Sequence, residues 1–283
     1  MTSEPEHRAI NGASVAIYRD APRWEEMRTA AIGGFRCDDA ARGAILLSEI
    51  AAMLSAEGFV ALIGPMDGDT WHRYRVVTES DGSAPYLLEP VSDPSSHQAF
   101  RDAGFTSISH YVSARGLLTD AIAPEPPSVP GITVTAWDGT RSEALFDRLF
   151  ESSTGAFARN YFFKPITKPA FLKLYEPVIP LIDPRHVLFA RDPSGNLVGF
   201  LFGIPDRLEG AAPKTVILKT YASGVSGVGH LLADAFHREA LALGYVNVIH
   251  ALMHESNVSL QRSDRYGAKV FRRYALMGRR LMS

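Results

Sequence analysis

The residues best suited to chemistry lie in a glycine-rich loop in the C-terminal half of the sequence. Gly224, Gly227 and Gly229 follow an apolar run at 215–221 and precede an amphipathic run at 230–243. A strand, a glycine loop and a helix in this order direct free backbone N–H groups at a phosphate, because glycine allows close approach and the helix start carries partial positive charge. Three glycines also suit a flexible turn without a ligand, so the loop alone leaves both interpretations open.

Composition predicts a packed, globular chain. Of the 283 residues, 46% are hydrophobic and 21% are charged, and the net charge of -2 argues against a general nucleic-acid binder. Cys37 is the only cysteine, so neither an intrachain disulfide nor a thiolate metal cluster is expected, and the histidines lack metal-ligand spacing. The N-terminal residues do not resemble a signal peptide, and no apolar run approaches membrane-spanning length. We therefore expect a cytoplasmic protein without a bound metal.

An internal repeat connects the glycine loop to the N-terminal half. Gly43 and Gly58 are separated by fifteen residues, as are Gly229 and Gly244, and both pairs match at an offset of 186. Apolar positions of the two segments match at the same offset, and the ends of the halves correspond in their Gly-to-Tyr spacing of seven, at 104–111 and 267–274. The series predicts two related units of one fold, with 13–75 equivalent to 199–261 and 132–190 without a counterpart.

The proline-rich segment 123–131 marks the boundary between the units. We expect residues 1–122 to form one unit and residues 132–283 the other. The second unit contains additional elements: a strand at 132–137, a helix opened by the capping box at 140–143, an aromatic segment at 157–163 and a strand hairpin at 186–202. Residues 132–283 are thus expected to run strand, helix, helix, three strands, glycine loop, helix, strand, helix, strand.

This order of elements, together with the loop, resembles the GNAT superfamily of acyl-CoA N-acyltransferases. The pyrophosphate loop of that family has the pattern Gln/Arg-x-x-Gly-x-Gly/Ala; Gly227 and Gly229 match it, and Gly224 stands where Gln or Arg is usual. The resemblance implies an α/β (α+β) fold of two GNAT-like mixed-sheet units. The C-terminal unit is complete, and residues 13–117 form a truncated unit that begins at the third strand of the fold.

The resemblance also implies a cofactor, acetyl-CoA or another acyl-CoA, held where strands 215–222 and 246–252 part. Asn257 would contact the thioester arm, although it is equally suited to be a helix N-cap. The expected cofactor-binding residues are Thr220, Tyr221, Ala222, Gly224, Ser226, Gly227, Val228, Gly229, His230 and Asn257.

Amine acylation needs a base for the ammonium and an acid for the leaving thiolate. Many family members have a tyrosine seven residues after the asparagine, but this sequence has Asp264 there, and Tyr266 lies offset around the helix. We expect Asp264, Tyr266 and Glu255 to be the catalytic residues, with Asp264 more important than Tyr266. Further candidates for the base are His254, Asp206 and Glu209.

The N-terminal unit departs further from the family pattern. Asp38, Ala41 and Gly43 occupy the positions of the three loop glycines, and Trp71 replaces the asparagine. Because Asp38 would repel a pyrophosphate, we expect this unit to be structural or to form a wall of the acceptor site. The acceptor pocket is expected to include residues 157–163 and 174–182, with Arg159 as a candidate partner for a substrate carboxylate.

We therefore expect an N-acyltransferase that moves an acetyl or other acyl group from acyl-CoA to a small amine or amino acid. The alternative is a non-catalytic GNAT-like module that binds acyl-CoA as a sensor. A dinucleotide-dependent oxidoreductase is disfavoured by the order of the glycines. The expected partner is a small-molecule amine, with no nucleic acid and no membrane; a homodimer is left open.

Overall fold

In the computed structural model, which describes residues 4–140, 142–158, 160–265 and 267–281, twelve strands form one mixed sheet. The strand order is β1-β2-β3-β4-β12-β6-β11-β10-β9-β8-β7, and β5 pairs with β12 beside this path. The strands are β1 (Glu6–Ile10), β2 (Ala13–Tyr18), β3 (Thr29–Cys37), β4 (Ala61–Gly64), β5 (Val76–Ser80), β6 (Thr106–Leu117), β7 (Thr133–Ala136), β8 (Val187–Arg191), β9 (Leu197–Pro205), β10 (Thr215–Ser223), β11 (Asn247–His254) and β12 (Lys269–Arg280).

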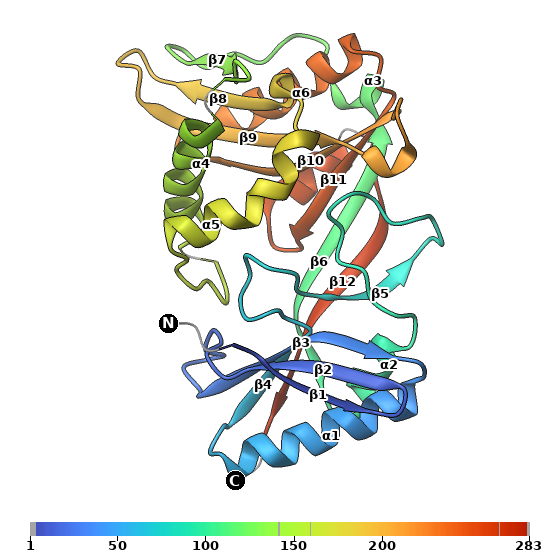
Figure 1. Cartoon of the computed structure of the whole chain (residues 1–283). Helices are drawn as coiled ribbons and strands as arrows, with labels where there is room; N and C mark the ends of the chain where they lie inside the picture. Colours follow the sequence, from blue (N-terminus) through green and yellow to red (C-terminus); the bar gives the residue numbers. More distant parts are fainter. Residues whose placement is uncertain (1–3, 141, 159, 266, 282–283) are drawn as a thin grey trace.

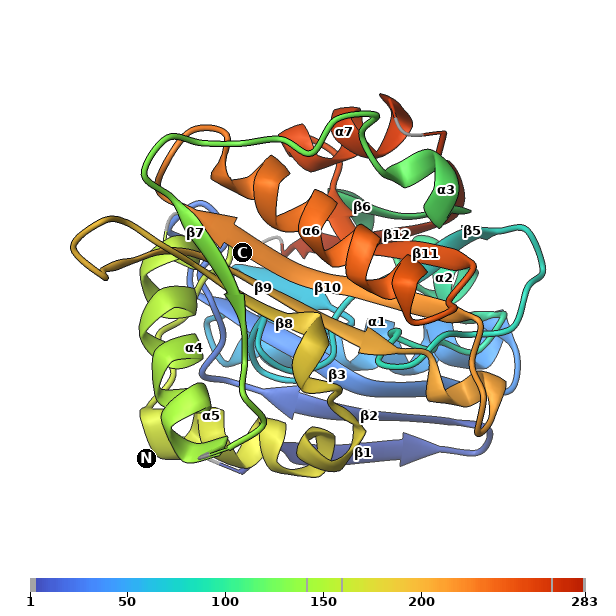
Figure 2. The same cartoon turned by 90° about the horizontal axis from the view of Figure 1, so that it is seen from above.

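The helices cover the sheet in two groups, one for each half of the molecule (Figures 1 and 2). Helix α1 packs its apolar face on β2, β3 and β4, and α6 packs on β8, β9 and β10. The helices are α1 (Ala40–Ala56), α2 (Ser96–Asp102), α3 (Leu118–Ala121), α4 (Ser142–Phe157), α5 (Lys168–Tyr175), α6 (Val228–Ala242) and α7 (Val258–Arg265). Among the described residues, no helix is long and apolar enough to span a membrane.

The two halves share one strand register at the offset of 186. Strands β3 and β4 run parallel with Thr29 opposite Ala61, and β10 and β11 run parallel with Thr215 opposite Asn247. Adding 186 to the first pair gives the second, and the same holds for the next two pairs along the strands. The predicted equivalence of 13–75 and 199–261 therefore has a counterpart in the order β2-β3-α1-β4 and β9-β10-α6-β11.

The helix ends agree in the same detail. Gly58 and Gly244 follow the C-caps with φ of 82° and 86°, a left-handed conformation that glycine adopts without steric cost. Gly58 donates from its backbone N–H to Ser55 O, and Gly244 donates to Leu241 O, which is the equivalent residue. The equal glycine spacings in the sequence therefore correspond to two equivalent helix C-termini.

The last strand of each unit lies between strands of the other half. The carboxyl end of β12 pairs with β4, while β6 pairs with β11 on one edge and with β12 on the other. Figure 1 shows β6 and β12 running side by side from one half of the molecule to the other. The expected boundaries at 122 and 132 stay a prediction, but the sheet is continuous across them and the units exchange their final strands.

The sequence did not indicate β1, which pairs antiparallel with β2 and adds an edge strand to the N-terminal unit. Its residues Glu6–Ile10 are largely exposed, so they lack the apolar alternation that marks a half-buried strand. Helix α1 begins at Ala40, three residues before the glycine expected to open it, because the Asp39 side chain caps it by accepting from Arg42 N. Residues 174–182, expected as a short helix and loop, contain the end of α5 and a 3-10 helix at Glu176–Leu181.

Candidate active site

Strands β10 and β11 separate after four pairs of residues. The last parallel pair is Leu218 and His250; beyond it, β10 pairs only with β9, and β11 pairs only with β6 among the described residues. Both strands are irregular at this level: the β10–β9 register shifts at Lys219, and the β11–β6 register skips Ala251 and Leu252. Bulges bend strands and redirect side chains. The two strands therefore splay where the resemblance to the GNAT superfamily implied an opening.

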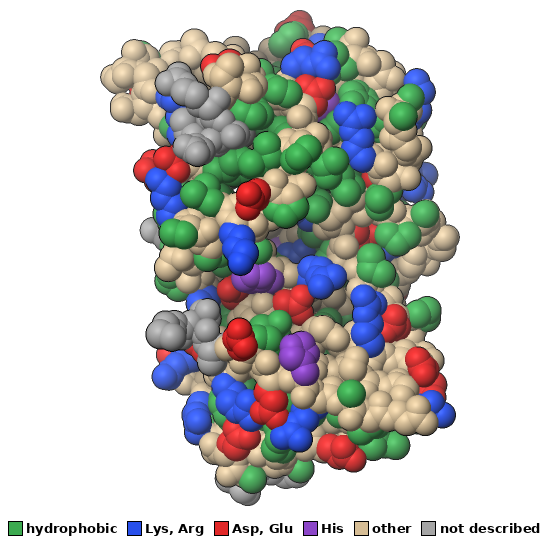
Figure 3. All heavy atoms as spheres, viewed as in Figure 1, with side chains coloured by type: hydrophobic (Ala, Val, Ile, Leu, Met, Phe, Trp, Pro, Cys, Tyr) green, Lys and Arg blue, Asp and Glu red, His purple; other side chains and the backbone are tan. Residues whose placement is uncertain are grey.

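A cavity of about 860 Å³ lies at this splay and extends to the N-terminal unit. One wall is formed by Lys219, Thr220 and Tyr221 of β10, and another by residues 250–254 of β11. The loop 70–75, between β4 and β5, closes the opposite side. Figure 3 shows the molecule hollowed between its two halves, with basic and histidine side chains near the hollow. The cavity is thus shared by both units.

Ten cofactor-binding residues were expected, and they fall into two groups. Thr220, Tyr221, His230 and Asn257 line the cavity. Ala222, Gly224, Ser226, Gly227, Val228 and Gly229 lie outside its lining, in the end of β10, the loop and the first turn of α6. Their role in binding stays a prediction.

The start of α6 has the form required to receive an anion. Gly227 is its N-cap residue with φ of 83°, no side chain caps it within the described chain, and its first turn contains no acidic residue. Residues 223–227 are exposed, and the N-cap position, which Asp39 occupies in α1, is held here by a glycine without a side chain. An uncapped helix start with exposed glycines leaves backbone N–H groups available to a phosphate. These residues therefore fit the pyrophosphate of an acyl-CoA.

Lys219 is the one lysine in the lining of the cavity, within the described residues. Its Nζ donates to the Leu88 carbonyl at 3.0 Å, and no described carboxylate forms an ion pair with it. Burial, assisted by the nearby charge of Arg75, lowers the pKa of Lys219 to about 7. An amine with this pKa is available in its uncharged form near neutral pH, which is the form a general base needs.

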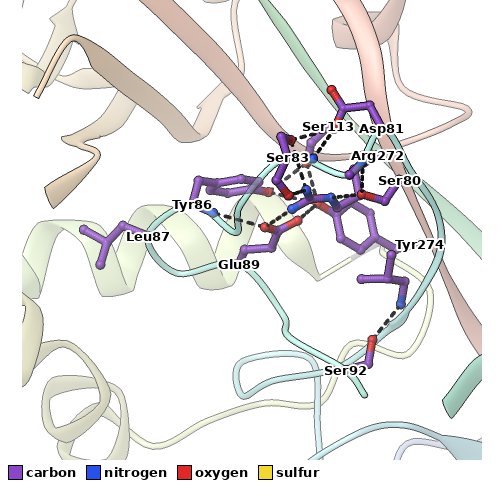
Figure 4. A network of polar contacts seen from close by, with 12 residues as sticks. Ser80, Asp81, Ser83, Tyr86, Leu87, Glu89, Ser92, Ser113, Arg272 and Tyr274 are labelled. Carbon is purple, nitrogen blue, oxygen red and sulfur yellow. Dashed lines mark hydrogen bonds and ion pairs between the residues drawn. The ribbon is translucent and has the colours of Figure 1, made fainter. Parts of the chain in front are cut away.

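A buried polar network holds the segment that contacts Lys219 (Figure 4). Glu89 accepts from Arg272 at 2.5 Å and from the Tyr274 hydroxyl, and its other contact is the backbone N–H of Tyr86. Tyr86 in turn bonds to Ser113 Oγ at 2.7 Å. The network joins the segment 80–92 to β6 and β12, so it fixes the position of the Leu88 carbonyl beside Lys219. Burial raises the pKa of Tyr86 to about 12, so it remains a neutral hydroxyl there.

Two histidines of the cavity lining, His237 and His250, form a hydrogen-bonded chain with Ser263. His250 Nδ1 lies 2.7 Å from Ser263 Oγ, the two Nε2 atoms of His250 and His237 are 3.1 Å apart, and His237 Nδ1 lies 3.0 Å from Ala121 O. Because a carbonyl only accepts, His237 donates from Nδ1, His250 donates from Nε2, and Ser263 donates to His250. These directions require that both rings are neutral, and every atom of the chain then has a partner. Burial lowers the pKa of His237 to about 4 and that of His250 to about 3, in agreement with this requirement.

Two of the three predicted catalytic residues, Glu255 and Asp264, lie away from the cavity. Glu255 is exposed and forms an ion pair with Arg273 at 2.7 Å, and Asp264 is exposed on α7. Neither belongs to the lining, whereas Ser263, the neighbour of Asp264, does. Tyr266 lies outside the described residues. The roles of Asp264, Tyr266 and Glu255 therefore stay predictions, and the geometry adds no support to Asp264 or Glu255.

The further candidates for the base are engaged elsewhere. Asp206 accepts from the backbone N–H of Leu87 at 3.0 Å and so holds the segment 80–92, and Glu209 accepts from Thr215 Oγ1 at 2.5 Å. His254 lines the cavity, but its Nδ1 accepts from Ser256 N, and burial lowers its pKa. Its neutral ring then carries the proton on Nε2, which leaves no free lone pair for a base.

The predicted acceptor wall is built of aromatic residues from both units. Tyr161, Phe163, Tyr175 and Val178 of the C-terminal unit line the cavity together with Trp71 of the N-terminal unit. Trp71 makes edge-to-face contacts with Phe163 and Phe171, at ring distances of 6.0 and 5.7 Å. Arg159, the expected partner for a carboxylate, lies outside the described residues.

Sequence reasoning missed Lys219 and Arg75. The signal for Lys219 was a single lysine at the end of an otherwise apolar strand, directly before the residues expected to bind the cofactor. Arg75 lies in a loop whose sequence, Trp-His-Arg-Tyr-Arg, offers two arginines with no indication of which is buried. Its position depends on contacts with β6, which only the folded chain provides.

Comparison with known proteins supports the fold at low sequence identity. No family model matches the sequence, and no curated protein matches it. Among solved structures, the chain is similar to a GCN5-related N-acetyltransferase from Sphaerobacter thermophilus, with 16% identity over 96% of this chain and 78% of that one, at a TM-score of 0.56.

Two further solved structures extend the similarity. A tandem GNAT protein from the clavulanic acid biosynthesis pathway has 14% identity over 100% of this chain and 85% of that one, at a TM-score of 0.59. Eis1 from Mycobacterium abscessus has 11% identity over 99% of this chain and 64% of that one, at a TM-score of 0.51. The chain therefore has the fold of the GNAT superfamily, arranged as two GNAT-like mixed-sheet units.

Proposed function

We propose that this protein is an acyl-CoA-dependent N-acyltransferase that acts on a small amine. The observation that carries the proposal is the open splay of β10 and β11, which is continuous with a cavity large enough for a small acceptor. The unpaired edges of the two strands offer backbone groups to an extended ligand such as the pantetheine arm. Thr220, Tyr221 and Ala222 would bind that arm, the loop from Gly224 to His230 would bind the pyrophosphate, and Asn257 would lie near the thioester.

Acyl-CoA, when bound, supplies an acyl group on a thioester that an uncharged amine can attack. The protein must therefore remove a proton from the ammonium form of the acceptor. Lys219 is suited to this step, because its Nζ faces the cavity and its lowered pKa of about 7 provides the free amine. One proton of the acceptor ammonium passes to Lys219 Nζ. The freed amine then forms the N–C bond as the C–S bond breaks, and the leaving thiolate takes up the second proton that the nitrogen loses as the amide forms.

The bonds of Lys219 also explain how the base is positioned. The Leu88 carbonyl accepts one of its protons, and that carbonyl is fixed by the buried Glu89–Arg272 pair. The lysine is thus oriented by the N-terminal unit while its backbone belongs to the strand that would hold the cofactor. The N-terminal unit, which lacks an open splay of its own, contributes to the site through this contact.

The proposal is tested in two steps. Thermal-shift and calorimetric titrations with acetyl-CoA and longer acyl-CoAs measure binding, and thiol release with a panel of amines measures transfer. We expect binding of at least one acyl-CoA and thiol release with at least one amine. Binding without release for every amine tested would identify the protein as a non-catalytic acyl-CoA module, and the absence of binding would overturn both functions.

A further inference from the structure

Arg75 is a buried cation at the seam of the two units. Its side chain is 8% exposed and lines the cavity. The guanidinium carbon lies 3.9 Å from the centre of the Tyr74 ring and 3.8 Å from that of Tyr111, and these two rings are perpendicular. The guanidinium therefore sits in the angle between two aromatic faces, where cation–π attraction stabilises it.

The positive charge of Arg75 is not balanced by any ion pair with a described carboxylate. Within the described residues, its Nε is buried without a hydrogen-bond partner, and one of its terminal nitrogens donates to the Tyr74 hydroxyl. A buried charge is costly unless it is paired. An anion that occupies the cavity beside Arg75 would balance this buried charge.

The carboxylates of the cavity lining cannot supply that anion, because each has its own partners. Asp67 accepts from Gly34 N at 2.8 Å and pairs with Arg73. Glu89 is held by Arg272, and Asp234 pairs with Arg238 at 2.6 Å.

The backbone at Arg75 supports a positioned role. Its φ is 90°, a region that residues with a Cβ seldom adopt, and its N–H donates to Pro65 O at 2.9 Å. Such conformations persist where the surroundings hold them in place, and they concentrate at ligand sites. Here the conformation turns the side chain out of the loop 65–75 and against β6.

We infer that the acceptor amine carries a carboxylate, which Arg75 binds while the amine lies toward Lys219. The planar guanidinium matches a carboxylate better than any other small anion, because two N–H groups can donate in parallel. The aromatic wall of Trp71, Phe163 and Tyr175 favours an apolar or aromatic side chain on the same molecule. The substrate class is therefore an apolar amino acid, and this inference rests on the proposed function for the fate of its amine.

The test compares amino acids with their decarboxylated amines, for example L-phenylalanine with phenethylamine and L-leucine with isoamylamine. Binding is measured by saturation-transfer NMR without acyl-CoA, and thiol release is measured with acetyl-CoA. For the wild type we expect the amino acid to be preferred by about 30-fold or more in both measurements, the loss typical of breaking a buried charge pair. Arg75→Met should remove that preference by raising KM for the amino acid more than for phenethylamine. Because the charge of Arg75 also lowers the pKa of Lys219, the ratio of the two substrates is compared within each variant, where a change in the base affects both alike.

Two further variants make the result decisive. Arg36→Met removes the same charge from an exposed position of β3, so it should keep the preference for the amino acid. If Arg75→Met does not fold, Arg75→Lys keeps the charge but loses the paired donors, and the preference should still fall about tenfold. An unchanged preference in folded Arg75 variants would overturn the inference while the transferase function stands. Amino-acid binding that depends on Arg75 without any thiol release would retain the inference and reject the transferase function.

Discussion

The two parallel strand pairs of the sheet begin in the same register and end differently. In the N-terminal unit, the chain that leaves β4 returns to β3: Met66 N donates to Ile32 O at 2.7 Å, and Asp67 accepts from Gly34 N at 2.8 Å. In the C-terminal unit, the equivalent residue, Leu252, donates instead to Ser113 Oγ of β6. One splay is therefore closed by its own chain, and the other stays open toward the cavity.

The residues behind this difference occupy equivalent positions. Lys219 faces the cavity in the C-terminal unit, and its equivalent at the offset of 186 is Gly33. A Cβ built on Gly33 would lie 2.4 Å from Asp67 Oδ1 and 2.6 Å from Met66 O. Closure of the N-terminal splay thus requires a position without a side chain, whereas the open splay carries the proposed base at that position.

The N-termini of α1 and α6 also differ, because, of the two, only the N-terminus of α1 is capped by a described side chain. Asp39 caps α1, and the carboxylate of Asp93 accepts from Cys37 N at 3.0 Å, so protein carboxylates occupy the region where the other unit would bind a phosphate. The start of α6 has no such cap within the described chain. The same strand–helix–strand arrangement thus occurs in two forms. In the N-terminal unit, protein oxygen atoms accept from the backbone N–H groups at the strand ends and the helix start. In the C-terminal unit, the corresponding region is open and would be available to a ligand.

The largest effect is expected from Lys219→Met. Turnover should fall 10²–10⁴-fold, the range typical of a general base, while acyl-CoA affinity stays within about threefold. In the wild type, kcat/KM should fall about tenfold per pH unit below about 7, because protonated Lys219 cannot accept a proton. Steady-state kinetics over pH 5.5–8.5 measures both, with the exposed Lys269→Met as the control. Full activity of Lys219→Met would reject Lys219 as the general base and leave Asp264 and Tyr266 as the remaining candidates.

Acid should destabilise the protein through histidines of the C-terminal unit. The folded pKa values of His186 and His237 are about 4 and that of His250 about 3, below the ordinary 6.5. The unfolded chain therefore binds protons first, so stability is full above pH 6.5 and declines as the pH falls toward 4, by on the order of 2 kcal/mol per histidine at pH 5. Urea unfolding at pH 7.5 and pH 5 measures the loss.

His186→Phe should reduce that loss by about one third, since His186 is one of three such histidines and packs on Phe236 and Tyr245 without a hydrogen bond from its ring. The equivalents of His237 and His250 in the N-terminal unit are Ala51 and Gly64, which do not titrate. Equal acid sensitivity in His186→Phe would show that other groups control the transition.

Gly33→Ala should destabilise the protein by about 1–3 kcal/mol, because the added methyl group must displace the backbone at Met66. Gly224→Ala is the matched control, since a Cβ there meets nothing within 4 Å, and its stability should remain near that of the wild type. Chemical unfolding of both variants compares them directly. If Gly33→Ala were as stable as the control, the backbone at Met66 and Asp67 would have to move at little energetic cost.

The smallest effect is expected from exchanging the loop residues that follow the splayed strands. Gly224→Asp gives the C-terminal loop the residue that Asp38 provides in the N-terminal one, and the added charge should weaken acyl-CoA binding about tenfold. Asp38→Gly, the reverse change, should leave the affinity unaltered. Calorimetric titration tests both. Gly43 is not a suitable position for such an exchange, because it is packed against Ala99 and Phe35 and a side chain there would disturb the fold.

Local signals in the sequence accounted for the paired helices and their flanking strands, and the resemblance to the GNAT superfamily supplied the expectation of a splay. Gly58 and Gly244 mark helix ends because a left-handed residue stops a helix wherever it occurs, and the run after Thr215 is strand-like without help from the rest of the chain. The roles of the residues at the candidate site were harder to predict from the sequence. Glu255 could not be distinguished from a free base until Arg273 was seen to pair with it, and the placement of Arg75 depends on Tyr111, 36 residues away. Long-range contacts, rather than local preference, decide such roles.

The exchange of β6 and β12 has a consequence for the order in which the chain can mature during synthesis. The edge of β4 is covered by Met277–Arg280 of β12, which are synthesised more than 200 residues after β4. A chain truncated after Ala268 should leave that edge open and give higher hydrogen exchange in β4 than the full chain. The N-terminal half is therefore made first but keeps one strand edge unpaired until β12 has been synthesised.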